Sequence, residues 1–177
     1  MSPSVNKICG IIDFDGFNVR GEFLVREFGY ISMKPTWRKG KSKRYDLRPY
    51  SYLITKKDSR CIHYVVNNIF GMPFRPFLGE YVHKLENLDY HVVDFYESCR
   101  SSYRNILGYK GGQIEKEWLD GLGIPSVNLE IYGCPKFNDL HCEKYDKISC
   151  GYHIKNLHCP RAEVTAFRDW IYQTYLS

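Results

Sequence analysis

Long apolar runs are missing from this chain of 177 residues. No stretch approaches the ~20 consecutive apolar residues that cross a bilayer, so the sequence predicts no transmembrane helix. The segment MSPSVNKICG has one lysine and no apolar core, and therefore lacks the shape of a secretory signal. We expect an intracellular protein with no membrane partner. Its seven cysteines should then be reduced thiols or metal ligands rather than disulfides.

Internal repeats, low-complexity segments and long linkers are missing as well. A chain of this length can bury roughly 70 % of its unfolded surface around one core, so we predict a single domain over residues 1–177. The patterns predict strands over 7–33 (two), 45–54, 90–96, 105–110 and 127–133, and helices over 59–74, 78–88, 111–123 and 160–175. A meander of three antiparallel strands followed by alternating helices and strands predicts an α/β fold with a mixed sheet.

Two aspartates stand two positions apart in the first predicted strand. Asp13 and Asp15 should project from the same face of that strand, because side chains alternate between faces. Two carboxylates this close repel each other unless a cation lies between them. The alternative is an acidic pair ahead of a turn at Gly16.

Two glutamates lie on or beside the apolar stripes of predicted helices. Glu163 is one turn before Phe167 on the stripe of the last helix, and Glu115 precedes Trp118 and Leu119 at the edge of another. A glutamate on a buried face is costly unless it is paired or binds a metal, although the helix dipole also favours glutamate in a first turn. With the two aspartates, these residues could bind a pair of divalent cations of the kind that promotes phosphodiester cleavage.

The chain resembles the DEDDh-type 3′–5′ exonucleases of the ribonuclease H-like fold over nearly its whole length. The matching motifs are IIDFDG in the first strand, IFGMPF after a helix, GGQIEKEWL with its glutamate and leucine four apart, and HCPRAE with a histidine five before an acid. The resemblance implies a 3′–5′ exonuclease acting on RNA or single-stranded DNA, with single-stranded RNA the favoured partner. It implies two Mg²⁺ or Mn²⁺ ions held by Asp13, Asp15, Glu115 and Glu163, with His158 as the general base that takes a proton from the attacking water.

Three of the four acidic positions depart from the family pattern by one methylene group. Asp15 stands for a glutamate, whereas Glu115 and Glu163 stand for aspartates. Reduced activity or none is therefore an open alternative. Asp94, within the apolar run HVVDFY, is a rival for the middle acidic position.

Cysteine and histidine cluster just before the last helix. Cys150 and His153 are separated by two residues and Cys159 follows, a composition typical of a closed structural zinc site. By spacing alone the fourth ligand could be any of Cys134, His141, Cys142 and His158. The segment also resembles the Glu-Cys-His-Cys motif of Maelstrom domains, which implies one Zn²⁺ completed by Glu27. Buried thiols without a metal are the alternative.

The formal charge of +5 is concentrated in WRKGKSKR. Its five basic residues could bind the phosphates of a nucleic acid, or they could be a solvated hairpin tip: Arg38, Lys39, Lys41, Lys43 and Arg44. The leading hypothesis is the two-metal exonuclease. Its alternative is a catalytically inactive, Maelstrom-like domain that binds nucleic acid or acts as a scaffold, and an interaction module unrelated to nucleic acids is a third possibility.

Overall fold

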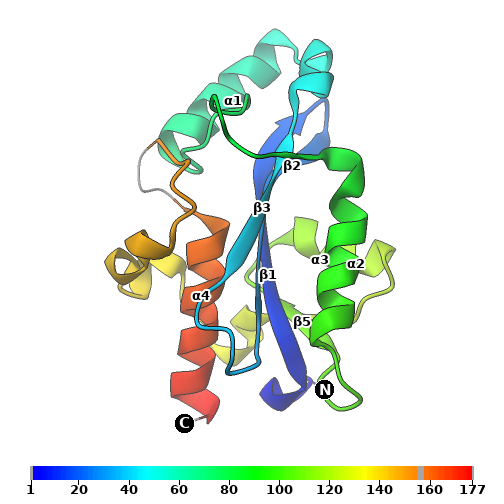
Figure 1. Ribbon diagram of the computed structural model, residues 1–177, viewed down its shortest axis with the longest axis vertical. Helices are drawn as coiled ribbons and strands as arrows, with labels where there is room; N and C mark the ends of the chain where they lie inside the picture. The colour runs from blue at the N-terminus through cyan, green and yellow to red at the C-terminus, as the bar shows by residue number, and fades with distance from the viewer. Residues whose placement is uncertain (1, 155–157, 177) are drawn as a thin grey trace.

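A computed structural model describes residues 2–154 and 158–176 of the chain. Its centre is a six-stranded mixed sheet in the order β4-β3-β2-β1-β5-β6 (Figure 1). Strands β1 (Ile8–Val19), β2 (Glu22–Ser32) and β3 (Lys41–Asp46) form the predicted antiparallel meander. Strands β5 (Ile106–Tyr109) and β6 (Ser126–Asn128) extend it in parallel with β1, and β4 (His83–Lys84) pairs in parallel with β3. The expected α/β, ribonuclease H-like architecture is confirmed.

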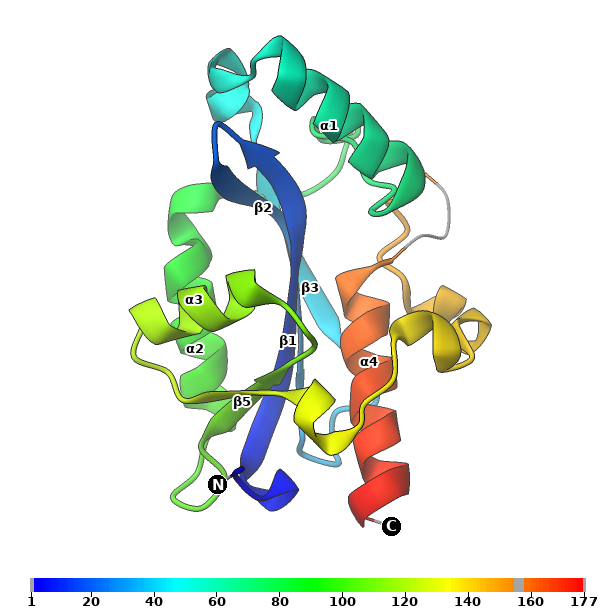
Figure 2. The same cartoon turned by 180° about the vertical axis from the view of Figure 1, so that it is seen from behind.

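Helices cover both faces of the sheet. Helix α4 (Pro160–Ile171) lies on one side and α2 (Leu88–Cys99) on the other, while α1 (Lys56–Asn68) crosses the far end of the β1–β2 hairpin (Figure 1). The reverse view shows α3 (Gln113–Gly121) beside α2, on the opposite side of β1 from α4 (Figure 2). None of the described helices is long and apolar enough to span a bilayer.

The long β1–β2 hairpin bends at a glycine. The ladder shifts register between Asp15 and Gly16, and the chain reverses at Arg20 and Gly21, which both have positive φ. A side chain at Gly16 would lie 1.9 Å from the Leu24 carbonyl oxygen, so the bulge accepts only glycine. The turn therefore falls four residues later than a break at Gly16 would place it.

The segment predicted as a strand over 90–96 is helical, and that prediction is wrong. Its β-branched and aromatic residues favour a strand locally. The buried positions of α2 nevertheless recur at helical spacing, namely Leu88, Val92, Phe95, Tyr96 and Cys99. Burial against the sheet outweighs the local preference.

Three other boundaries differ from prediction. Residues 78–88 contain the short strand β4 and a 3₁₀ turn over Leu85–Asn87 rather than a helix. The strand predicted over 45–54 is found over Lys41–Asp46, and Arg48–Leu53 form a 3₁₀ helix instead. The strand predicted over 127–133 ends at Asn128, where the asparagine side chain caps a 3₁₀ turn by accepting from the amide of Glu130. The last helix begins at Pro160 as predicted and continues as a π-helical turn to Leu176.

Candidate functional site

One candidate metal centre joins β2 to the segment before α4. The ligand atoms of Glu27, Cys150, His153 and Cys159 all lie within 4.8 Å of one another. Glu27 and His153 side chains are 0 % and 1 % exposed, and the thiol of Cys159 lies 3.8 Å from a Glu27 carboxylate oxygen. One oxygen, one nitrogen and two sulfurs form a donor set that suits a tetrahedral ion. This buried group could bind a metal such as zinc.

The orientation of His153 is set by a backbone carbonyl. Its Nδ1 donates to the carbonyl oxygen of Phe70 at 2.6 Å, and its Nε2 lies 2.9 Å from Glu27 Oε1. A ligating histidine commonly gives its second ring nitrogen to such an acceptor, which fixes the tautomer. Phe70 begins the turn with Gly71, whose φ is +77°. The predicted turn motif therefore supports the thiol centre, a role that the sequence did not suggest.

The protons of this centre are distributed unevenly. Burial lowers the pKa of His153, but hydrogen bonds to Cys159 and Glu27 outweigh it and raise the pKa to about 10. Burial alone would raise the pKa of Cys159, yet hydrogen bonds with Cys150 and His153 hold it well below its usual value. The pKa of Cys150 is raised, first by its hydrogen bond to Cys159 and then by burial. The hydrogen bonds within the group thus favour the charged forms of His153 and Cys159.

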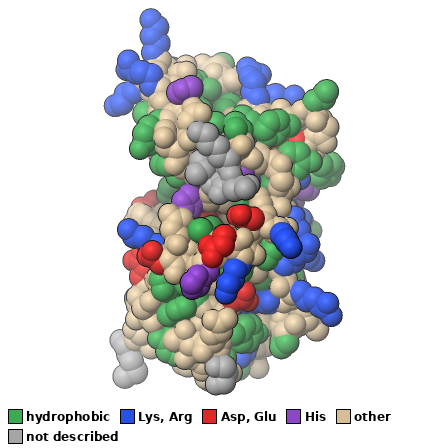
Figure 3. Space-filling model, turned by 90° about the vertical axis from the view of Figure 1, so that its left-hand side faces the viewer, with side chains coloured by type: hydrophobic (Ala, Val, Ile, Leu, Met, Phe, Trp, Pro, Cys, Tyr) green, Lys and Arg blue, Asp and Glu red, His purple; other side chains and the backbone are tan. Residues whose placement is uncertain are grey.

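A second candidate centre is purely acidic. Oxygens of Asp13, Asp15 and Glu163 lie within 4.8 Å of one another. Asp13 and Asp15 point from the same face of β1, as predicted, and Glu163 comes from the first turn of α4. Acidic side chains on the α4 side gather with histidine and basic side chains beside them (Figure 3).

A glycine allows α4 to approach these aspartates. Gly29 is the partner of Asp13 across the β1–β2 ladder. A side chain at Gly29 would lie 2.5 Å from the carbonyl carbon of Pro160, the first residue of α4. Only glycine leaves room for that helix to start against the sheet and to bring Glu163 beside Asp13.

Glu115 reaches the same region from α3. Its side chain is buried, and Oε1 accepts a hydrogen bond from the backbone amide of Phe14 at 3.2 Å. That amide is free for this contact because β5 pairs with β1 only as far as Ile11. Glu115 is not within the tight three-residue group, although its charge raises the pKa values of both aspartates. The fourth predicted carboxylate therefore flanks the other three.

The acidic centre carries unbalanced negative charge. Burial, followed by the charges of Glu163 and its acidic neighbours, raises the pKa of Asp13 well above its usual value. The pKa of Asp15 is raised in the same way, and the charge of the nearby Glu27 contributes to this rise. Asp13 Oδ2 is buried and has no hydrogen-bond partner among the described residues. Carboxylate oxygens that face one another without a donor are the ligands that Mg²⁺ and Mn²⁺ prefer.

His158 lies on the acidic side and Cys159 on the thiol side, because the backbone at Cys159 is extended and successive side chains of extended backbone alternate. His158 Nδ1 is 3.3 Å from Glu163 Oε1, and its side chain is 31 % exposed. The hydrogen bond to Glu163 raises the pKa of His158 against the opposing effect of burial. Residues 155–157, which precede His158 in the chain, lie outside the described residues.

The rival residues lie elsewhere. Asp94 is exposed on α2, so the middle acidic position belongs to Glu115 by geometry. Among the described residues, the other spacing-based zinc candidates fall outside the thiol centre: Cys134, His141, Cys142 and His158.

The basic stretch is divided between the two sides of β3. Lys41 Nζ lies 4.4 Å from the ring centre of Trp37, and Lys43 lies over Tyr30 on the α2 side. Arg44 points the other way and lies 3.4 Å from Glu80, with its side chain only 15 % exposed. Arg38 and Lys39 are exposed in the preceding loop. The five residues thus do not share one surface.

Arg44 belongs to a buried ion network that sequence reasoning missed. Arg26 makes two hydrogen bonds to Glu80, at 2.8 and 2.9 Å, and both side chains are fully buried. Arg44 also lies 4.5 Å from the ring centre of Tyr152. In the chain, Tyr152 stands between the thiol-centre ligands Cys150 and His153. The network ties the loop after α1 to the sheet beside the thiol centre. The available signal was a pair of adjacent charged residues, Arg26 and Glu27, flanked by apolar residues in FLVREFGYI.

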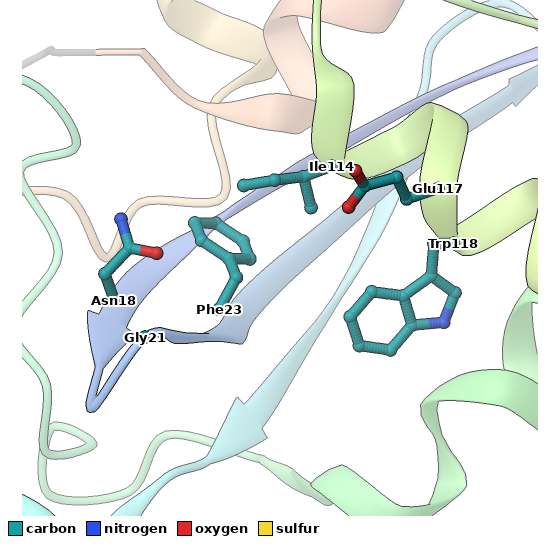
Figure 4. A pocket seen from close by; sticks show the side chains of 6 residues that line it. All are labelled: Asn18, Gly21, Phe23, Ile114, Glu117 and Trp118. Carbon is teal, nitrogen blue, oxygen red and sulfur yellow. The ribbon is translucent and has the colours of Figure 1, made fainter.

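A pocket of about 340 Å³ opens beside α3 (Figure 4). Phe23 and Trp118 provide its aromatic walls, and Ile114 lies next to Glu115 in the chain. Its remaining lining residues are Asn18, Gly21 and Glu117. Aromatic faces of this kind can stack against nucleobases.

No family model, curated protein or solved structure matches the chain. Assignment of the two centres therefore depends on their geometry and on the motifs in the sequence.

Proposed function

We propose that the chain is a metal-dependent 3′–5′ exonuclease that acts on RNA or single-stranded DNA. The observation that carries the proposal is the convergence of Asp13, Asp15 and Glu163 around a buried oxygen of Asp13 that has no hydrogen-bond partner among the described residues, with His158 beside them. Buried carboxylates this close are costly to ionise unless cations balance their charge.

Four carboxylates would hold the ions: Asp13, Asp15, Glu115 and Glu163. Two Mg²⁺ or Mn²⁺ ions, when bound, activate a water molecule and stabilise the leaving oxygen of a phosphodiester. His158 can donate Nδ1–H to Glu163, which leaves the lone pair of Nε2 available to take a proton from that water. Its partly exposed side chain allows exchange of the proton with solvent.

A single strand is the substrate form that the surroundings favour. The pocket beside α3 offers aromatic faces that an unpaired base can reach, whereas a paired base cannot leave its stack without cost. Reduced ligand thiols suit an intracellular location, which is part of the same proposal. The thiol centre would hold one structural Zn²⁺ and so fix the start of α4.

End-labelled strands test the proposal. The purified protein is incubated with 5′-labelled and 3′-labelled single strands, with and without Mn²⁺, beside Asp13→Ala. We expect a ladder from the 5′ label and immediate release of the 3′ label with the parent protein, only when metal is present, and neither product with Asp13→Ala. Asp94→Ala is the matched control and should cleave normally, because Asp94 is exposed on α2. Equal cleavage by Asp13→Ala and the parent would falsify the site.

A catalytically inactive, Maelstrom-like domain that binds nucleic acid or acts as a scaffold is the second candidate. The longer side chains at positions 115 and 163 favour it, because Glu115 bonds to the backbone beside the three-residue group instead of joining it. That candidate predicts strand binding without cleavage in any divalent metal, with binding retained in Asp13→Ala.

A further inference from the structure

Two buried cysteines meet away from both candidate centres. Cys9 is the second residue of β1, and Cys99 is the last residue of α2. Cys99 Sγ donates to Cys9 Sγ at 3.5 Å, and the two residues are 5 % and 1 % exposed. Ninety positions separate them in the chain, so the fold alone brings the thiols together.

The thiols line a pocket of about 370 Å³ near the end of the molecule where both termini lie (Figure 1). Two cationic side chains line it as well. Lys34 Nζ donates to the carbonyl of Ser98 at 3.1 Å, and Arg104 Nη1 donates to that of Ile8 at 3.2 Å. A small oxidant can therefore reach sulfur atoms that larger reagents cannot, in a positively charged setting that favours thiolates.

We propose that Cys9 and Cys99 form an oxidation site, at which a peroxide converts the dithiol to a disulfide that links β1 to α2. The remaining cysteines differ in setting: Cys61 is exposed on α1, whereas Cys150 and Cys159 belong to the thiol centre. The proposal does not depend on the nuclease function.

Cys9 is the attacking group. The hydrogen bond from Cys99 lowers its pKa, against the effect of burial, and the charges of Arg104 and Arg100 lower it further. The Cys9 thiolate attacks one peroxide oxygen, the O–O bond breaks, and hydroxide leaves to give a sulfenic acid. The sulfur of Cys99 then loses its proton and attacks the sulfur of Cys9, and the S–O bond breaks. Two thiols and one hydrogen peroxide thus give one disulfide and two waters.

The required movement is small. The sulfurs must close from 3.5 Å to a bond length of about 2.05 Å. The cross-link would close a loop of roughly ninety residues, which restricts the unfolded chain strongly and should raise the Tm by about 5–15 °C.

Peptide mapping of the purified protein tests the site. The protein is treated with a few equivalents of hydrogen peroxide, denatured in an alkylating reagent, digested and analysed by mass. We expect a Cys9–Cys99 linked peptide, a loss of about 2 Da per chain relative to two free thiols, and a Tm increase that dithiothreitol reverses. Full alkylation of both cysteines, at doses that oxidise the exposed Cys61, would overturn the proposal.

Cysteine variants separate the two steps. In Cys99→Ser the reaction should stop at the sulfenic acid of Cys9, which dimedone captures, and the Tm increase should vanish. Cys61→Ser is the control and should form the linked peptide as the parent does. Dimedone capture at Cys61 instead of Cys9 would count against the site. If Cys99→Ser does not fold, the mapping of the parent protein decides the proposal by itself.

Discussion

The two candidate centres are neighbours on one face of the sheet, yet they balance charge in opposite ways. Asp15 of the acidic centre and Glu27 of the thiol centre are partners across the β1–β2 ladder. The thiol centre mixes donors and acceptors, so His153 can bond to Glu27 at 2.9 Å. The three carboxylates of the acidic centre supply acceptors only, and Asp13 Oδ2 has no hydrogen-bond partner within the part of the chain that the structure describes.

This difference indicates two kinds of dependence on metal. A buried group whose donors and acceptors are hydrogen-bonded to one another is tolerated without an ion. When an ion binds, its ligands also tie separate segments of the chain together. A buried group of like charges gains from a cation at once, because repulsion and desolvation both oppose ionisation. We therefore expect the thiol centre to control stability and the acidic centre to control activity.

Removing a carboxylate ligand should have the largest effect. Glu163→Gln keeps the shape of the side chain but removes its charge, so metal-dependent cleavage should fall by about 10³-fold or more. The zinc content should not change. Rates on a labelled strand and metal analysis of the same sample check both points. A loss of zinc in Glu163→Gln would show that the two centres are not separable.

Removing a thiol ligand should act first on folding. Cys150→Ser should lose zinc and about 4 kcal/mol of stability, because metal binding contributes directly to folding. Activity should fall as well, since α4 starts beside the bound segment. Thermal unfolding and metal analysis measure the effect.

Two variants serve as controls for the thiol centre. Cys142→Ser lies outside the centre and should keep one zinc per chain. His158→Ala should keep zinc and stability while removing activity, because its contact is with Glu163. A parent protein without zinc would contradict the assignment.

Neutralising Asp13 should stabilise the metal-free protein. The folded-state pKa of Asp13 is raised well above its usual 3.8, so its contribution to stability is present below that usual value and is lost as pH rises through the raised pKa. With a chelator present at pH 7.5, the free energy of unfolding of Asp13→Asn should therefore be about 1–2 kcal/mol higher than that of the parent. The gain should disappear near pH 4.

Divalent metal should reverse the order of stability of the parent and Asp13→Asn. Mn²⁺ should raise the Tm of the parent more at pH 7.5 than at pH 5, and it should raise that of Asp13→Asn much less, because one ligand charge is missing. Asp94→Asn, on the exposed side of α2, should match the parent throughout. A metal-free Asp13→Asn that is less stable than the parent at pH 7.5 would break the comparison between the centres.

The smallest expected effect concerns the basic stretch. Arg38, Lys39, Lys41 and Lys43 can be replaced by serine without breaking the Arg44–Glu80 ion pair. Each lost phosphate contact should lower the slope of log K against log salt by ~0.7 for a single strand. Lys56→Ser with Lys57→Ser, at the start of α1, is the control for the pair Arg38→Ser with Lys39→Ser, because each double variant removes two positive charges. An unchanged slope would identify the stretch as a solvated edge with no role in binding.

Much of the fold and of both centres could be predicted from local patterns. Alternation in β1 aligned Asp13 with Asp15, and the helical stripe of α4 oriented Glu163 inward. Extended backbone before α4 separated His158 from Cys159. Periods of two and of 3.6 residues depend only on backbone geometry, so the sequence alone decides which side chains share a face.

Tertiary structure decided the contacts that no periodicity of the sequence predicts. Helix α2 forms where a strand was predicted, because its buried positions pack against the sheet. The local sequence does not specify that sheet. Gly29 let α4 approach, the Phe70 carbonyl oriented His153, and Arg44 turned away from Lys43 into an ion pair. The meeting of Cys9 with Cys99 is of the same kind. Each of these contacts joins segments far apart in the chain, where packing and burial determine the neighbour, whereas the sequence by itself determined only the faces that were available to meet.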